Sequence, residues 1–392
     1  MILRVCIKLI IVSCLSYSGV TLAVNNPPSN ATVVNLRTAC IEGGVEVTNC
    51  FDELNSLENW MNSIRSASSL LINVGPGNFT RGFSGVITGA LNCSTANITI
   101  KGSGRENSHI QTNFGSFPSA GIHINSGCTN LDVQDIKISG WLQGAVVTEL
   151  SAITSWTNVE LSGGNYGWLE SGACPNNDGK HTWFSSRIIA TGATGGTITY
   201  TAACAQSWFW GSQIVSSNNG VGASSSYALQ ATQAEIHLYG SNVRLIVANG
   251  IDAEGADVIR SLNNSEIHIH GTGLDLTHNG TGAVSFLEAD SSSMIHANES
   301  AFSLHNNGTG TVSRLTGNGK ISAPYHWGGK TTPPGISSRS GADTYIEIDC
   351  PVADDCSAGG TFPHTMVYRA ECTGSGADEG PWYDTVTNLC RK

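Results

Sequence analysis

The chain has 392 residues, a formal net charge of −11, only 12% charged residues and 46 glycines. Nucleic acids and anionic membranes both favour basic patches, so this charge excludes them as expected partners. Most of the remaining polar side chains are neutral hydrogen-bonding groups, which suit sugars and suit any long extracellular β-protein equally well.

Residues 1–23 are predicted to form a secretory signal peptide. A basic start at residues 1–4 precedes an apolar run at residues 7–12, and residues 21–23 form a cleavage site of small residues. The apolar run is too short to span a bilayer, and no later segment of the sequence is suited to do so. We therefore expect a secreted protein, extracellular or periplasmic, without membrane insertion.

Ten of the twelve cysteines remain once the signal peptide is removed. An even number of cysteines in an exported chain favours disulfides, and none of them has the paired spacing of a zinc site. Pairing of neighbours is the simplest assignment, although the sequence does not determine the connectivity. It gives the pairs Cys40–Cys50, Cys93–Cys128, Cys174–Cys204, Cys350–Cys356 and Cys372–Cys390.

One amphipathic helix is predicted in the N-terminal segment, residues 24–69. Apolar residues recur at helical spacing between residues 51 and 66, with polar residues between them. They are Phe51, Leu54, Leu57, Trp60, Met61 and Ile64. A buried strand and a turn follow at residues 70–80. We expect the helix to cap the first coil of a solenoid, because an open solenoid end exposes its core and its backbone edge.

Residues 70–323 are predicted to form a parallel β-helix. Three similar strands begin at Glu235, Glu266 and Met294, and their isoleucines are 31 and then 28 residues apart. Short strands that recur every 20 to 30 residues between turns are typical of stacked β-coils. One inward apolar residue is assigned to each coil. These are Ile98, Leu131, Val159, Ile188, Ile214, Ile236, Ile267, Ile295 and Ile321.

The composition changes after residue 323. Residues 324–341 are predicted to be a linker, and residues 342–392 a small disulfide-rich C-terminal appendage with four of the ten mature cysteines. The sequence does not define the oligomeric state, and it does not exclude a trimer.

Four segments together resemble the pectin-lyase-like right-handed parallel β-helix superfamily: the predicted helix and residues 70–80, 97–104 and 129–140. The resemblance covers about residues 50 to 323 and implies an all-β fold. That superfamily includes pectate lyases, polygalacturonases, pectin esterases, phage tailspikes and non-catalytic adhesins, so the fold does not name an activity. The motifs of its particular enzyme families are largely missing.

Asp132, Glu160 and Arg187 are the candidate catalytic residues. If each inward residue marks the same position in its coil, Asp132 and Glu160 are adjacent carboxylates on one outer face, and Arg187 lies nearby. The two carboxylates could hold Ca²⁺ while the arginine neutralises a uronate, as lyase chemistry requires. They could also be the acid and base of glycoside hydrolysis. The competing interpretation is a solvated acidic surface.

Histidines form a second predicted column, with His237, His268 and His296 one coil apart and with Glu235 and Glu266 beside two of them. Stacked imidazoles could contact a sugar, bind a transition metal or act as a general acid. They could equally be a surface ladder inherited from duplicated coils. We list His237 and His268 as candidate substrate-binding residues.

Six of the nine tryptophans fall between residues 141 and 210. Aromatic rings can stack on pyranose faces while neighbouring polar groups bind the hydroxyls. Trp141, Trp168 and Trp210 are predicted to reach solvent and, with Tyr166, to bind substrate. In contrast, Trp156, Trp183 and Trp208 recur at coil spacing and are assigned to the core.

These patterns predict an exported, carbohydrate-active β-helix protein whose partner is a polysaccharide. If it is catalytic, it is a polysaccharide lyase or a glycoside hydrolase. The alternative is a non-catalytic adhesin or a surface polysaccharide-binding protein. The sequence does not decide between them.

Overall fold

The computed structural model describes most of the chain between residues 31 and 322 and several short strands beyond it. The described ranges are 31–42, 45–46, 48–63, 69–81, 89–94, 97–112, 120–172, 174, 179–192, 197–218, 226–247, 256–306, 312–317, 319–322, 336–337, 345–349, 365–368, 382–384 and 389–391. The predicted signal peptide lies outside them.

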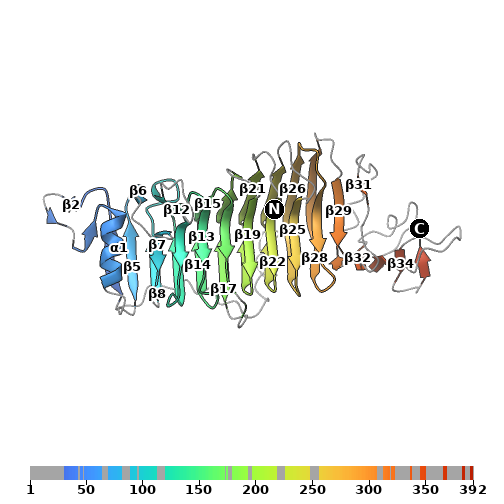
Figure 1. Ribbon diagram of the computed structural model, residues 1–392, viewed down its shortest axis with the longest axis horizontal. Coiled ribbons are helices and arrows are strands. Elements are labelled where there is room, and N and C mark those ends of the chain that lie inside the picture. The colour runs from blue at the N-terminus through green and yellow to red at the C-terminus, as the bar shows by residue number, and fades with distance from the viewer. Residues whose placement is uncertain are drawn as a thin grey trace, which may run out of the picture.

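The fold is an all-β parallel solenoid, a β-helix, with three ladders of strands that run along an elongated rod (Figure 1). The first face comprises β5 (Leu70–Val74), β8 (Asn97–Lys101), β11 (Asn130–Gln134), β14 (Ile153–Thr157), β17 (Lys180–Phe184), β20 (Gln206–Trp210), β23 (Glu235–Tyr239), the first halves of β26 (Glu266–His278) and β28 (Met294–Asn306), and β30 (Lys320–Ser322).

The second face comprises β6 (Gly77–Arg81), β9 (Ser108–Thr112), β12 (Lys137–Ser139), β15 (Glu160–Gly163), β18 (Arg187–Ala190), β21 (Gln213–Asn218), β24 (Asn242–Val247) and the second halves of β26 and β28. The third face is a 10-stranded sheet. It comprises β7 (Gly89–Cys93), β10 (Ala120–Ile124), β13 (Gln143–Val147), β16 (Tyr166–Glu170), β19 (Thr197–Ala203), β22 (Ser226–Thr232), β25 (Ala256–Leu262), β27 (Val284–Ala289), β29 (Val312–Gly317) and β31 (Ile336–Ser337).

The first two faces meet at a two-residue corner that recurs from coil to coil. Its leading residue has a left-handed backbone, which Asn, Asp and Gly adopt most easily. These residues and their φ values are Asp135 (53°), Asn158 (53°), Ser185 (49°), Gly211 (56°), Gly240 (54°) and Gly271 (54°). The second corner residue faces inward. In three coils it is a buried serine, and the hydroxyls of Ser212 and Ser241 accept the backbone N–H of Ser186 and Ser212 at 3.2 Å.

Helix α1 (Leu54–Ser63) lies at the N-terminal end of the rod (Figure 1). It buries Leu54, Leu57 and Met61 against the core, as their helical spacing predicted. The helix is shorter than the prediction at its start, because Phe51 belongs to strand β4 (Cys50–Phe51). Phe51 still packs on the Trp60 ring, with 5.6 Å between the ring centroids.

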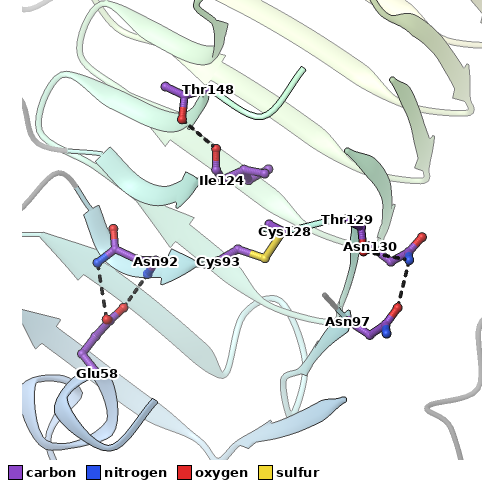
Figure 2. Close-up of a disulfide and its surroundings, with 9 residues drawn as sticks. All are labelled: Glu58, Asn92, Cys93, Asn97, Ile124, Cys128, Thr129, Asn130 and Thr148. Carbon is purple, nitrogen blue, oxygen red and sulfur yellow. Dashed lines mark hydrogen bonds between the residues drawn. A yellow bond between two sulfur atoms is a disulfide. The ribbon is translucent and has the colours of Figure 1, made fainter. Parts of the chain in front are cut away.

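Glu58 connects the helix to the first strand of the third face (Figure 2). Its carboxylate accepts the backbone N–H of Asn92 on β7 and lies 3.5 Å from the Arg81 guanidinium. Arg81 in turn donates to the carbonyl oxygens of Gly89 and Ala90 at 2.8 and 3.1 Å. Because β7 ends its ladder, its outer N–H groups would otherwise be buried without an acceptor. The helix therefore satisfies the sheet edge as well as covering the core.

Other short strands complete the N-terminal end. Strand β1 (Thr32–Leu36) pairs in parallel with β4 and β5, and β2 (Ile41–Glu42) pairs antiparallel with β3 (Val45–Glu46).

Three of the predicted disulfides are confirmed: Cys40–Cys50, Cys93–Cys128 and Cys174–Cys204. The Cys93–Cys128 bridge joins the end of β7 to the turn before β11 (Figure 2). Disulfides of this kind fit a secreted protein. The other two predicted pairings involve residues outside the described part of the chain.

Beyond residue 322, the structure describes short strands. Strand β31 lies within the predicted linker and pairs with β29, so the third ladder continues into that segment. Strand β32 (Tyr345–Asp349) pairs in parallel with β30, and β33 (Thr365–Tyr368), β34 (Trp382–Asp384) and β35 (Leu389–Arg391) follow it as antiparallel strands.

The core lies inside the rod. Ile236, Ile267, Ile295 and Ile321 stack one above another on the first face and are fully buried, as predicted. Among the described residues, no helix is long and apolar enough to cross a membrane.

Candidate functional site

The outer surface of the first face carries three columns of side chains, because every second residue of each strand faces outward. The leading column is Asn97, Asn130, Ile153, Lys180, Gln206, Glu235, Glu266 and Met294. The central column is Thr99, Asp132, Ser155, Thr182, Trp208, His237, His268 and His296. The trailing column is Lys101, Gln134, Thr157, Phe184, Trp210, Tyr239 and His270.

The C-terminal halves of two columns are ladders of stacked rings. In the central column Trp208, His237 and His268 follow one another with centroid separations of 5.8 and 4.6 Å, and His296 follows at 4.9 Å. In the trailing column the successive separations from Phe184 to Trp210, Tyr239 and His270 are 4.7, 5.8 and 5.1 Å. Each ring inside a ladder covers the faces of its neighbours, so it presents mainly its edge to solvent.

Both ladders end where the columns change to short hydroxyl side chains. The remaining face of Trp208 lies toward Thr182, and that of Phe184 lies toward Thr157. Ser155 comes next in the central column. We call Ser155, Thr157 and Thr182 the Ser–Thr step. A short hydroxyl side chain covers less of an indole or phenyl ring than a second ring does, so each end ring has one face that is less covered than the faces within the ladders.

Asp132 borders the Ser–Thr step on the side opposite Trp208. Its side chain pairs with Ser155 across the ladder and accepts a hydrogen bond from the Gln134 side-chain amide at 2.7 Å. Burial raises the pKa of Asp132, while the hydrogen bonds from Gln134 and Ser155 act in the opposite direction. The site therefore holds a carboxyl group that is more readily protonated than an exposed aspartate.

The predicted proximity of Asp132 and Glu160 is wrong. Glu160 lies on the second face, where its carboxylate is 2.8 Å from the Lys137 ammonium and 3.6 Å from the Arg187 guanidinium. Glu160 and Arg187 are thus neighbours, as predicted, but Asp132 pairs with Ser155 on the first face. The two carboxylates therefore lie on different faces and are not the adjacent pair that the predicted Ca²⁺ site assumed.

The physical reason lies at the inward positions of three strands. Leu131 pairs with Thr154, not with Val159, and the next inward residues of the first face are His181 and Ser207. These side chains are polar although they are fully or almost fully buried. The apolar residues nearest to the expected spacing are the corner residue Val159 and then Ile188 and Ile214 of the second face, which explains the wrong register.

The predicted substrate-binding aromatics are distributed over several faces. Trp210 joins His237 and His268 on the first face, but Tyr166 is half-buried on the third face. Trp141 is 47% exposed in the turn that follows β12.

Two tryptophan assignments are wrong, and strand alternation explains both. Trp168 is fully buried because it occupies an inward position of the third face, stacked on Tyr200 at 5.9 Å. Trp208 was assigned to the core, but Phe209 takes the inward position of β20 and Trp208 faces outward. Trp156 and Trp183 are buried, as predicted.

The imidazole ladder carries carboxylates beside it. His237 Nε2 is 2.8 Å from Glu235 Oε1, and His268 Nε2 is 3.1 Å from Glu266 Oε1. Burial and the neighbouring His237 lower the pKa of His268. A neutral imidazole is therefore favoured at this position in neutral solution.

A cluster on the third face was missed by the sequence analysis. The Arg260 guanidinium is 2.9 Å from the Glu288 carboxylate, donates to the Tyr227 hydroxyl at 2.5 Å, and lies 4.7 Å from the centroid of that ring. Asp257 is buried beside them and accepts a hydrogen bond from the Ser285 hydroxyl. No local motif connects these residues, which come from three successive strands.

Asp257 is expected to make stability depend on pH. Burial, and then the hydrogen bond and charge of Glu288, raise the pKa of Asp257 well above its usual value. A carboxyl whose pKa is higher in the folded state contributes stability below its unfolded pKa of about 3.9, and this is lost as the pH rises through the folded pKa. Denaturant unfolding measured over a pH series should show that the wild type loses stability as the pH rises. The loss should be smaller in Asp257→Asn. Glu106→Gln, at an 83% exposed side chain, should leave the wild-type profile unchanged. Parallel profiles for wild type and Asp257→Asn would contradict this account.

The fold and this surface together define a disulfide-bonded parallel β-helix protein with a polar and aromatic outer face. That class is compatible with both carbohydrate-active and adhesin-like proteins. No protein-family model matches the chain, and no curated protein matches it.

Proposed function

We propose that this is an exported polysaccharide-binding protein that holds a glycan along the first face, across the Ser–Thr step. The observation that supports this most directly is the end of the two ring ladders, where Trp208 and Phe184 face short hydroxyl side chains. An aromatic face next to hydroxyl groups matches the two surfaces of a sugar, whose C–H face stacks on a ring while its hydroxyls form hydrogen bonds.

The shape of the surface suits an extended ligand. Asp132 and Trp208 are separated by three strand spacings, which is about 14 Å along the rod. Beside Asp132 the leading column carries two amides, where Asn130 donates to Asn97 Oδ1 at 2.9 Å (Figure 2). Amide side chains offer both donors and acceptors to sugar hydroxyls. The glycan chain would therefore run parallel to the rod axis.

The charges near the step favour an acidic polysaccharide. Lys180 in the leading column and Lys101 in the trailing column are both exposed. The Asp132 carboxyl is buried and accepts a hydrogen bond from the Gln134 side-chain amide, which shields it from a ligand. On a chain with a net charge of −11, these cations support the binding of a uronate at this surface.

Catalysis at the same surface is the second candidate function. The observation that favours it is the burial of the Asp132 carboxyl beside Gln134 and Ser155, which raises its pKa in the direction that a general acid requires. A hydrolase or a lyase acting here would yield new reducing ends or unsaturated products. These products should disappear in Asp132→Asn.

Trp208→Ala and Phe184→Ala are each expected to weaken glycan binding. An aromatic stacking contact contributes about 0.5–1.5 kcal/mol, so the Kd should rise by up to about tenfold in each variant. Affinity electrophoresis against uronate-containing and neutral polysaccharides measures this, with acidic polymers expected to bind best. Trp141→Ala is the matched control, because it removes an exposed tryptophan outside the three columns. An equal loss in all three variants, or no loss in the first two, would argue against this site.

A further inference from the structure

Three side chains at the C-terminal end of the central and leading columns converge on one point. Glu266 and His268 lie two residues apart on β26 and so share its outer face, and His296 on β28 is the ladder partner of His268. Glu266 Oε1 is 3.1 Å from His268 Nε2 and 3.2 Å from His296 Nε2. Two imidazole nitrogens thus approach the same carboxylate oxygen. We call these three residues the imidazole–carboxylate triad.

We infer that the imidazole–carboxylate triad binds one divalent transition-metal ion, with Zn²⁺ as the reference ion. Zinc lies about 2.0–2.2 Å from nitrogen and carboxylate-oxygen ligands, so two ligands of a tetrahedral site are roughly 3.3 Å apart. The two distances from Glu266 Oε1 are close to that value. All three ligand atoms lie within 4.8 Å of one another. The strand pairing therefore brings the donors near coordination distance before any ion arrives.

The donor set selects the class of ion. Two imidazoles and one carboxylate suit Zn²⁺, Cu²⁺ and Ni²⁺, whereas Ca²⁺ and Mg²⁺ prefer ligands that are all oxygen. The side chains of His268, His296 and Glu266 are 23%, 33% and 45% exposed. An ion can therefore enter from solvent, and water can fill the coordination positions that the protein leaves open.

A second group of donors overlaps the triad and determines the stoichiometry. Glu235, His237 and His268 also have ligand atoms within 4.8 Å of one another. One His268 ring serves both groups, so the two groups compete for it and one ion per chain is the expected stoichiometry. The triad is favoured because both of its imidazoles contact the same carboxylate oxygen, while Glu235 also accepts a hydrogen bond from Gln206 at 2.8 Å.

Ion binding should change the ladder. The rings of His268 and His296 are inclined by only 14° to each other, with centroids 4.9 Å apart. A nitrogen lone pair lies in the plane of its ring, so nearly parallel rings direct their lone pairs alongside each other. Coordination of one ion therefore requires at least one ring to rotate about its Cβ–Cγ bond. The stack between these two histidines loosens when the ion binds.

The test is a Zn²⁺ titration of the full mature protein, prepared without a histidine tag, against a competing chromophoric chelator. Wild type should bind one Zn²⁺, and His268→Ala and His296→Ala should each weaken binding at least about tenfold. The controls are His270→Ala, an imidazole of the neighbouring column, and His237→Ala, from the overlapping group. Both should retain wild-type affinity, and Ca²⁺ should not displace the zinc. X-ray absorption should show two imidazoles and oxygen ligands.

Unchanged Zn²⁺ affinity in both His268→Ala and His296→Ala would overturn the inference, and so would an equal loss in His270→Ala. If His268→Ala does not fold, Glu266→Gln is the variant that tests the inference. It removes the anionic ligand, and the Glu266 side chain is 45% exposed. Wild-type zinc affinity in that folded variant would also overturn it. The result is independent of the proposed glycan binding, which depends on Trp208 and Phe184 and would survive the loss of this metal site.

Discussion

Replacing Glu170 by alanine is expected to lower the free energy of unfolding by about 3–5 kcal/mol. The Glu170 carboxylate is completely buried inside the rod, 3.0 Å from His181 Nε2. It also accepts the Trp168 indole N–H at 3.1 Å and the backbone N–H of Ala203 at 2.5 Å. Alanine would leave the Trp168 and Ala203 N–H groups without their acceptor and would remove the carboxylate beside His181, and each unsatisfied buried group costs about 1–3 kcal/mol. Denaturant unfolding of wild type and variant measures the difference.

Two further variants separate this explanation from a simple loss of volume. Glu170→Leu restores most of the side-chain volume but leaves the Trp168 and Ala203 N–H groups without their acceptor, so it should be about as unstable as Glu170→Ala. Glu170→Gln keeps a side-chain oxygen that accepts a hydrogen bond, so it should be more stable than either variant. A loss below about 1 kcal/mol in Glu170→Ala would show that water or a neighbour replaces the carboxylate, contrary to the expectation.

The same buried polar network explains where the sequence could and could not be interpreted. From Ile236 to Ile321 the inward residue of each coil on the first face is isoleucine, and there the predicted register is confirmed. Between Leu131 and Ile236 the inward residues are Thr154, His181 and Ser207. A polar residue in the core gives no apolar signal, so the register was lost where the network lies.

One local feature of the sequence would have predicted the correct strand register between these coils. The corner between the first two faces needs a left-handed residue after each strand of the first face, and Asp135 and Asn158 occupy that position in successive coils. Aligning these two residues would have placed Val159 beside Ile136 and Glu160 beside Lys137. The capping helix could be predicted because its pattern is short and local, and the three disulfides because each joins cysteines that follow one another in the sequence.

Only part of the candidate sites could be predicted from the sequence. The column of His237, His268 and His296 repeats in the sequence, so its members could be aligned directly. The Ser–Thr step depends on knowing which residues face outward in β14 and β17, and that is fixed only by the register. The cluster of Asp257, Arg260 and Glu288 joins three types of residue from two strands with no repeat to align. Long-range pairing of unlike residues leaves no period in the sequence.

Trp183→Ala is expected to lower the free energy of unfolding by about 3–5 kcal/mol, the usual cost of deleting a large buried aromatic side chain. Trp183 is fully buried between the rings of Trp156 and Phe209, at centroid separations of 4.9 and 5.8 Å. Its removal opens a cavity in a layer of rings from neighbouring coils. The closed β-helix backbone cannot collapse into that cavity without breaking ladder hydrogen bonds. Thermal and denaturant unfolding should both report the loss.

Trp210→Ala is the matched control, because Trp210 is also stacked between two rings, those of Phe184 and Tyr239, at 4.7 and 5.8 Å. It differs from Trp183 by facing outward, where it is half-buried. Stacking alone contributes about 0.5–1.5 kcal/mol, so the loss in Trp210→Ala should fall near that range. If the two variants lost equal stability, ring stacking would outweigh burial in this fold. A large difference would instead establish that burial inside the rod, more than ring stacking, makes the inner ladder stabilising.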